Sequence, residues 1–121
     1  MDAGFNDLAR PILYGGYHGI SFLRGGSTLE GPAEPTIVAG PLCESGDVFT
    51  QDDGGIIAPR PLPSAEVGDL VVFHDAGAYA SSMSSNYISR GLAPEVLVDG
   101  DRVQLIRRRQ TVSDLVALEA L

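Results

Sequence analysis

The sequence predicts a mainly β protein in which antiparallel strands form a barrel or a sandwich, with short helices near residues 6–14, 77–84 and 112–120. Fifteen glycines and eight prolines are spread over 121 residues, a composition that suits many short elements joined by turns. Residues 95–109 contain two alternating runs around Asp99-Gly100, which is typical of a β-hairpin. Since no repeat, linker or low-complexity tract divides the chain, a single β domain is expected over residues 1–121.

The first element expected along the chain is the N-terminal helix. Asn6 or Asp7 could serve as its N-cap, and Pro11 would fall in its first turn, where a missing N–H costs little. The pair Gly15-Gly16 is expected to end this helix.

Three strands are predicted before the hairpin. Residues 18–25 (HGISFLRG) alternate weakly, and residues 35–40 (PTIVAG) form a short β-branched run that a Gly-Pro pair ends. Residues 70–73 (LVVF) follow a Gly-Asp turn and indicate a buried strand. The segment 27–35 is expected to be a loop.

Two further helical segments are expected toward the C-terminus. Residues 77–84 are small and polar, which fits a short helix or an irregular loop. Thr111 or Ser113 is a suitable N-cap for a closing helix over residues 112–120, because apolar residues follow at helical spacing.

Composition excludes several classes of function. The net charge is −8, from 16 acidic and 8 basic residues, which argues against a nucleic-acid-binding protein. The apolar runs are too short to span a bilayer, and a single cysteine allows no internal disulfide, so a cytoplasmic protein without membrane contact is expected. All eight bases are arginine, and chemistry that needs a lysine amine therefore cannot come from this chain.

The only cysteine, Cys43, lies in the stretch GPLCESGD and has two interpretations. A free cysteine is often a buried apolar residue, but this one follows Gly-Pro and precedes polar, turn-forming residues. A Cys-His-Asp hydrolase could be assembled with His74 and Asp75, although a histidine at a strand end is more often structural. The cysteine and two scattered histidines have no metal-ligand spacing, and no glycine-rich phosphate loop is present.

The arginines offer two other candidates. The run 107–109 ends a hairpin strand and is interpreted as a solvated edge that discourages aggregation. Arg10 and Tyr14 lie four residues apart on the expected helix and hence on one face. A guanidinium beside a hydroxyl suits a carboxylate ligand, because arginine offers two parallel donors.

Taken together, these motifs resemble the C-terminal part of the diaminopimelate decarboxylases. These enzymes belong to the pyridoxal-phosphate decarboxylases, which join an alanine-racemase-like barrel to a β domain. The segments that carry the resemblance are, in order, MDAGFNDLARPILYGGYH, AGPLCESGDVF, GDLVVFHDAGAYASSMSSNY, PEVLVDG and LIRRRQT. They cover nearly the whole chain, and CESGD is the most specific, since related ornithine and arginine decarboxylases usually carry Asp in place of Glu44.

The resemblance implies a role for five residues. Cys43 would be the general acid that returns a proton to the α-carbon after carbon dioxide leaves, and Glu44 would bind the distal ammonium of meso-diaminopimelate. Arg10 and Tyr14 would hold the distal carboxylate, and Tyr79 would reach both the substrate and the phosphate of pyridoxal 5'-phosphate. A homodimer is implied as well, in which the loop with Cys43 enters the partner's barrel.

The resemblance also implies that most of the enzyme lies elsewhere. The family's barrel supplies the lysine that holds the cofactor, so the isolated chain is expected to be inactive, and its start looks like a cut through a longer protein. The chain also has Ile88 where the family usually has Asn. Two alternatives remain open: the same domain of a paralogue that decarboxylates another amino acid, and a stand-alone β module that binds a partner without catalysis.

Overall fold

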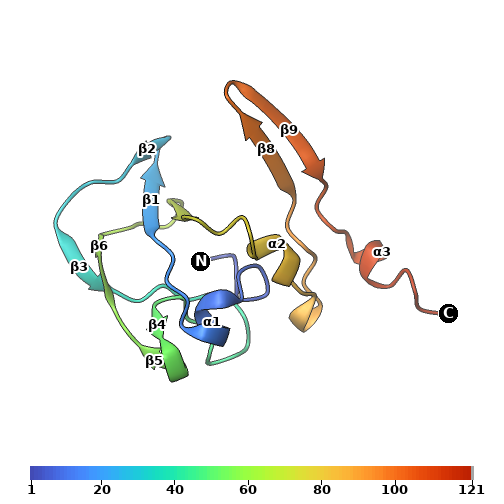
Figure 1. The fold of residues 1–121 in the computed structure, drawn as a ribbon, viewed down its shortest axis with the longest axis horizontal. Helices are drawn as coiled ribbons and strands as arrows, with labels where there is room; N and C mark the ends of the chain where they lie inside the picture. The colour runs from blue at the N-terminus through green and yellow to red at the C-terminus, as the bar shows by residue number, and fades with distance from the viewer. Residues whose placement is uncertain (121) are drawn as a thin grey trace.

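The computed structural model describes residues 1–120 and consists mainly of short strands, with α1 (Arg10–Tyr14), α2 (Ala80–Met83) and α3 (Val112–Leu115) as its α-helices. The first seven strands and α1 form one body, and the last two strands form a hairpin that projects away from it (Figure 1). The strands are β1 (Ile20–Arg24), β2 (Ser27–Thr28), β3 (Ala33–Thr36), β4 (Gln51–Asp52), β5 (Ile56–Ile57), β6 (Arg60–Pro63), β7 (Leu70–Phe73), β8 (Glu95–Asp99) and β9 (Arg102–Arg107), with 3₁₀ turns η1 (Asp53–Gly55) and η2 (Tyr87–Ser89).

Every strand pair in the described residues is antiparallel, which confirms the mainly β fold class. The sheets are β2-β1-β7, β3-β6, β4-β5 and β8-β9. The strands predicted at 18–25 and 70–73 are present as β1 and β7, and Phe22 pairs with Val71 between them. The expectation that β7 is buried is wrong, because Leu70 is 63% exposed and the other residues of β7 are only half-buried.

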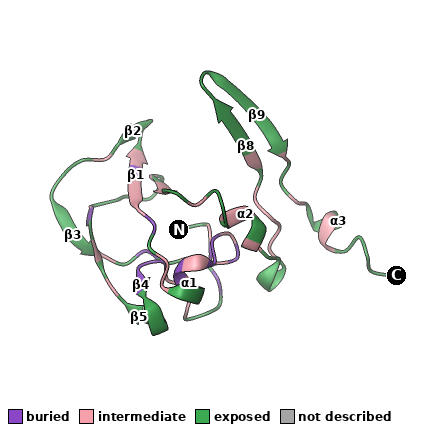
Figure 2. Cartoon of the chain, in the orientation of Figure 1, coloured by how far each residue is buried: buried purple, intermediate pink, exposed green. Residues whose placement is uncertain are grey.

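The core is small and lies where β1, the segment before β4 and α1 meet. Phe49, only 1% exposed, packs against Phe73 with ring centroids 4.8 Å apart. Figure 2 shows that buried residues gather in this part of the chain, whereas the hairpin is exposed over most of its length. Burial of one large apolar side chain contributes about 1.5–3 kcal/mol. The buried cluster consists of Leu8, Phe22, Val38, Phe49 and Leu62.

The N-terminal helix begins later than predicted. Its N-cap is Ala9, and neither Asn6 nor Asp7 caps it. Instead, the Asp7 carboxylate accepts the Gly4 N–H at 3.2 Å, and the Asp7 N–H donates to the Gly4 carbonyl at 2.9 Å. These two bonds close a separate turn, so the helix starts only after it. The prediction that glycine ends the helix is confirmed, since Gly15 is the C-cap with φ 61°.

The strand predicted at 35–40 is wrong, because β3 lies earlier and ends at Thr36. The segment expected to be a loop therefore contains both β2 and most of β3. Beyond β3 the chain makes only an isolated bridge, between Ala39 and Val48. The Val38 N–H donates to the Thr50 hydroxyl at 3.0 Å rather than to a carbonyl, which explains why no regular ladder continues there.

The predicted hairpin is confirmed as β8 and β9, and Gly100 turns the chain with φ 58°. The helix expected within 77–84 is confirmed as α2. Thr111 caps α3, and its hydroxyl and the Asp114 side chain form a capping box. However, α3 ends at Leu115 rather than near residue 120. Leu118 is 99% exposed, so the sequence beyond Leu115 has no packing to stabilise further turns. None of the helices within residues 1–120 is both long and apolar enough for a membrane crossing.

Candidate functional site

Helix α1 brings two of the predicted site residues into contact with a third segment. The Arg10 guanidinium carbon lies 4.9 Å from the centroid of the Tyr79 ring, within the range of a cation–π interaction. Arg10 is half-buried, whereas the Tyr79 side chain, just before α2, is 51% exposed. Tyr14 is 61% exposed one turn along the helix from Arg10. The Arg10 guanidinium and the Tyr79 ring are thus in contact, and the Tyr14 phenol reaches solvent one helical turn from Arg10.

A different face of α1 lines a cavity of about 410 Å³. Ala9, Ile12 and Leu13 line it, and they recur at the three- and four-residue spacing of one helix face. The face with Arg10 and Tyr14 is turned by more than a quarter of a circle from that one, since each helical residue advances by about 100°. The remaining lining residues are Phe5, Glu44, Gly46, Met83, Ser85 and Tyr87.

The loop around Cys43 presents its two candidate residues outward. Cys43 and Glu44 are both exposed, so Cys43 is not a buried apolar residue. The Glu44 carboxylate accepts the Gly46 N–H at 3.1 Å, which folds the loop back on itself. Glu44 is also the only carboxylate among the residues that line the cavity. The loop thus places a thiol in solvent and a carboxylate at the rim of an apolar hollow.

A buried carboxylate that the sequence analysis did not single out supports this loop. Asp47 is 3% exposed, and it accepts backbone N–H groups from Phe5 at 2.8 Å and from Leu42 at 2.9 Å. Leu42, five positions before Asp47, and Phe5, 42 positions before it, therefore share this one side chain. The signal in the sequence was the Gly-Asp pair after Cys43, which reads locally as a simple turn.

The structure therefore divides the five predicted residues into two groups. Arg10, Tyr14 and Tyr79 lie together on one side of α1, and Glu44 lies at the cavity on a different face. Cys43 is the residue before Glu44 and makes no hydrogen bond to the first group within residues 1–120.

The hydrolase alternative receives no support from the geometry. His74 Nε2 lies 2.7 Å from the Ser21 hydroxyl, and the His74 carbonyl lies 3.0 Å from His18 Nδ1. No hydrogen bond in the described part of the chain joins Cys43 to His74 or Asp75. His74 thus tethers β7 to β1 and to the segment before it.

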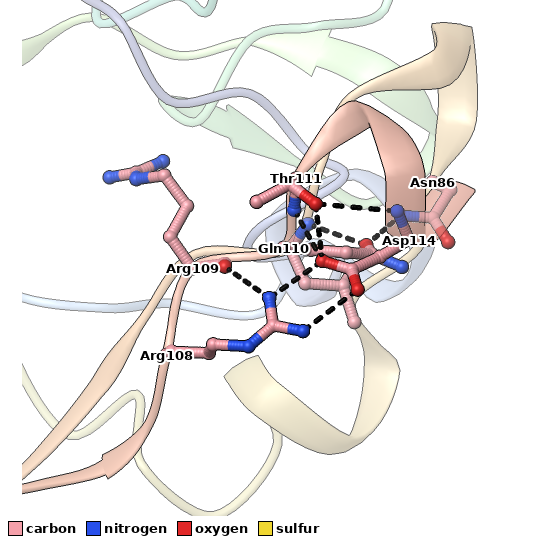
Figure 3. A network of polar contacts seen from close by, with 7 residues as sticks. Asn86, Arg108, Arg109, Gln110, Thr111 and Asp114 are labelled. Carbon is pink, nitrogen blue, oxygen red and sulfur yellow. Dashed lines mark hydrogen bonds and ion pairs between the residues drawn. The ribbon is translucent and has the colours of Figure 1, made fainter. Parts of the chain in front are cut away.

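The interpretation of residues 107–109 as a solvated edge is wrong for Arg107, whereas Arg108 and Arg109 are exposed. Arg107 is half-buried, donates to the Ser81 hydroxyl at 2.7 Å and lies 3.6 Å from a Glu95 carboxylate oxygen. Arg108 makes two bonds, of 2.6 and 2.8 Å, to the Asp114 carboxylate (Figure 3). These bonds raise the pKa of the Arg108 guanidinium and, with the Thr111 N–H, hold the pKa of Asp114 well below its ordinary value.

The chain matches a known family over more than half of its length. Residues 1–77 match the family described as "Pyridoxal-dependent decarboxylase, C-terminal sheet domain". The whole chain aligns at 60% identity with the diaminopimelate decarboxylase of Escherichia coli, and 98% of it aligns at 61% identity with that of Streptomyces coelicolor. The chain spans 29% and 27% of the length of these two relatives.

Solved structures agree with these matches. A crystal structure of diaminopimelate decarboxylase superposes with a TM-score of 0.95 at 61% identity, over 99% of this chain and 29% of that one. The Helicobacter pylori enzyme complexed with L-lysine superposes with a TM-score of 0.81 at 37% identity, over 98% of this chain and 27% of that one. In both, the similar region is a minor part of a longer polypeptide.

Proposed function

The chain belongs to the pyridoxal-dependent decarboxylases and corresponds to their C-terminal sheet domain, and from this premise we propose that it completes the active site of a diaminopimelate decarboxylase. In this proposal residues 1–121 are one β domain of a longer enzyme that converts meso-diaminopimelate to L-lysine and carbon dioxide. The relatives reported above carry that enzyme's name and align over nearly the whole chain. They do not favour a paralogue with another substrate or a module without catalysis.

The observation that carries this proposal is the arrangement of candidate residues on two sides of α1. Arg10 and Tyr14 offer a guanidinium and a phenol to the distal carboxylate of the substrate, and Glu44 offers a carboxylate to its distal ammonium. A substrate with one such tail needs both recognition elements at once, because either charge left unpaired in a buried site is costly. The resemblance to the family implies that the loop enters a partner's barrel, so in this proposal one site takes Arg10 from one chain and Glu44 from another.

The chain fits partial contact with the cofactor and not its covalent attachment. The Tyr79 ring is half-exposed, and no hydrogen bond within residues 1–120 occupies its hydroxyl, which is free to reach a phosphate or a substrate group. The cation–π contact with Arg10 sets the orientation of that ring. Pyridoxal phosphate, when bound, withdraws the electron pair that the departing carbon dioxide leaves behind. The amine that holds it must come from outside this lysine-free chain.

Cys43 would complete the reaction by proton transfer. The bond between the α-carbon and its carboxylate breaks, carbon dioxide leaves, and the α-carbon takes a proton from the Cys43 thiol. Water then returns a proton to the thiolate. Cys43 is exposed in this domain, so it is available to another subunit's active site. A thiol can exchange a proton near neutral pH.

The shared site predicts complementation between two inactive variants of the full-length enzyme. One variant lacks the cofactor-binding lysine of the barrel, and the other carries Cys43→Ala. When subunits exchange, a mixed dimer has one site with the intact barrel of one chain and the intact Cys43 of the other. We expect about one quarter of wild-type activity if random exchange makes half of the dimers mixed and each has one working site.

The measurement needs proof that mixed dimers form. A different affinity tag on each of the two chains provides it, because only a mixed dimer carries both tags. A mixture with proven heterodimers and no activity would rule out the trans arrangement, because sites built in cis would each keep one defect. As a control, Cys43→Ala mixed with itself through the same exchange should stay inactive. The homodimer and the cytoplasmic location remain predictions that belong to this proposal.

A further inference from the structure

The loop with Cys43 and Glu44 closes around one buried side chain. Both carboxylate oxygens of Asp47 are used, and each accepts a different backbone group: Oδ1 accepts the Phe5 N–H and Oδ2 accepts the Leu42 N–H. The Asp47 main chain also takes part, since its N–H donates to the Glu44 carbonyl at 3.1 Å and its carbonyl accepts the Gly40 N–H at 2.9 Å. Four bonds to one residue thus fix the path of the chain from Gly40 to Asp47.

Gly40 shows how closely the loop is built around this carboxylate. A Cβ placed on Gly40 would lie 2.1 Å from Asp47 Oδ2, far inside van der Waals contact. The glycine is therefore required by this approach, not by its backbone angles. The side chain that fills this space is the one that binds the Leu42 N–H, one residue before Cys43.

The same carboxylate connects the loop to the segment that leads into α1. The Phe5 N–H is one of its two donors, and the Phe5 ring packs against Tyr87 with centroids 5.1 Å apart. Both rings line the cavity at which Glu44 lies. Because α1 begins at Arg10, five residues after Phe5, this bond joins the loop to the segment that leads into the helix.

We propose that Asp47 is a positioning residue, which holds the loop against the Phe5 segment so that Cys43 and Glu44 are presented in a fixed geometry to the partner's site. It touches neither substrate nor cofactor and acts only through the loop and the Phe5 segment. This inference rests on the proposed function, because Asp47 is said to support residues whose roles that function defines. A displacement of about 1 Å at a catalytic group can reduce a rate by about a hundredfold.

The test is Asp47→Asn in the full-length holoenzyme, with Asp101→Asn as a matched control. An amide has the shape of the carboxylate but only one acceptor atom, so it cannot accept both N–H groups and turns its own donor toward one of them. Asp101 is exposed in the turn of the hairpin, away from the loop. We expect the Asp47 variant to lose about tenfold to a hundredfold in kcat/KM and the Asp101 variant to keep wild-type kinetics.

Two further readouts distinguish positioning from a general loss of stability. One is the alkylation rate of the Cys43 peptide by iodoacetamide, measured across pH by mass spectrometry on protein well below its unfolding temperature. The other is the stereochemistry of deuterium at the α-carbon when the reaction runs in heavy water. A displaced thiol changes the first and mixes the second, whereas a folded enzyme with an undisturbed loop changes neither.

Each outcome decides the question. Wild-type kcat/KM and wild-type labelling of Cys43 in a folded Asp47→Asn enzyme would overturn the proposal. If that variant does not fold, Asp47→Glu is measured instead, since it keeps two acceptor oxygens but must displace the loop, and we expect it to show the same kinetic defect. If both fail to fold, Asp47 supports the fold as a whole and the proposal is overturned. Full activity of Cys43→Ala would refute the proposed role of the thiol, while the labelling rates still report on Asp47.

Discussion

Replacement of Arg10 by lysine in the full-length enzyme is the most direct test of the substrate face. The substitution keeps the positive charge but replaces a planar fork with a single ammonium, which cannot make two parallel bonds to a carboxylate. Arg10 is half-buried and its guanidinium lies 4.9 Å from the Tyr79 ring centroid, so the new side chain also loses part of that contact.

The expected loss follows from these two interactions. One charge-assisted hydrogen bond is worth about 1.5–3 kcal/mol, and a cation–π contact at a partly exposed site is worth about 0.5–1 kcal/mol. Their sum, about 2–4 kcal/mol, corresponds to a fall in kcat/KM of roughly 30- to 700-fold, at about 1.4 kcal/mol for each factor of ten. The substitution should leave the stability of the protein nearly unchanged, because α1 has no other bond from this side chain within residues 1–120.

Steady-state kinetics with meso-diaminopimelate measure the loss, and two controls sharpen it. Arg102→Lys makes the same exchange at an exposed hairpin position and should be neutral. With a substrate analogue whose distal carboxylate is replaced by an amide, the ratio of kcat/KM between wild type and Arg10→Lys should be much smaller. Wild-type kinetics of the variant would remove Arg10 from the site, and an equal loss with both substrates would refute the assignment of its partner.

Two other predictions concern the chain by itself and its behaviour in acid. With pyridoxal phosphate and borohydride, the isolated chain should form no covalent adduct on a side chain, since it contains no lysine, and mass spectrometry that finds one would contradict this. The Arg24 guanidinium and the Glu66 N–H lower the pKa of Asp69 from 3.8 to about 2. The contribution of Asp69 to stability is therefore fully present above pH 3.8 and is lost as the pH falls through 2, so Asp69→Asn should flatten the pH dependence of urea unfolding in that window. An unchanged slope would show that the Arg24 contact contributes nothing to folding.

Elements specified by neighbouring residues could be predicted from the sequence. The hairpin is marked by two alternating runs and a glycine, and the α3 start by Thr111 with Asp114 three residues later, and both are present. The mainly β class follows from the same kind of local signal, since short runs between turns cannot form long helices. Arg10 and Tyr14 were placed on one face by spacing alone, and the helix carries both.

Elements that depend on distant partners could not be predicted. The apolar run 35–40 has the composition of a strand, but its Val38 N–H is taken by a side chain twelve residues away. The strand β3 instead spans Ala33–Thr36, although this segment contains an acidic residue and a proline. It forms because it pairs with β6, where Pro35 faces Pro61. Prolines can face each other in this way at positions that need no ladder hydrogen bond. Neither partner is visible in a window of local sequence.

The partners of the arginines at residues 107–109 could not be predicted from the local sequence either. Three adjacent arginines have the composition of a solvated edge, yet β9 ends at Arg107, and the chain beyond it follows a path that local sequence does not reveal. Arg107 reaches Ser81 in α2, two residues after Tyr79, and Arg108 reaches Asp114 in α3. Arg107 thereby ties the hairpin to the helix that follows a site tyrosine, and Arg108 ties the segment after β9 to the C-terminal helix. Composition alone does not distinguish Arg107, which packs against α2, from Arg108 and Arg109, which are exposed.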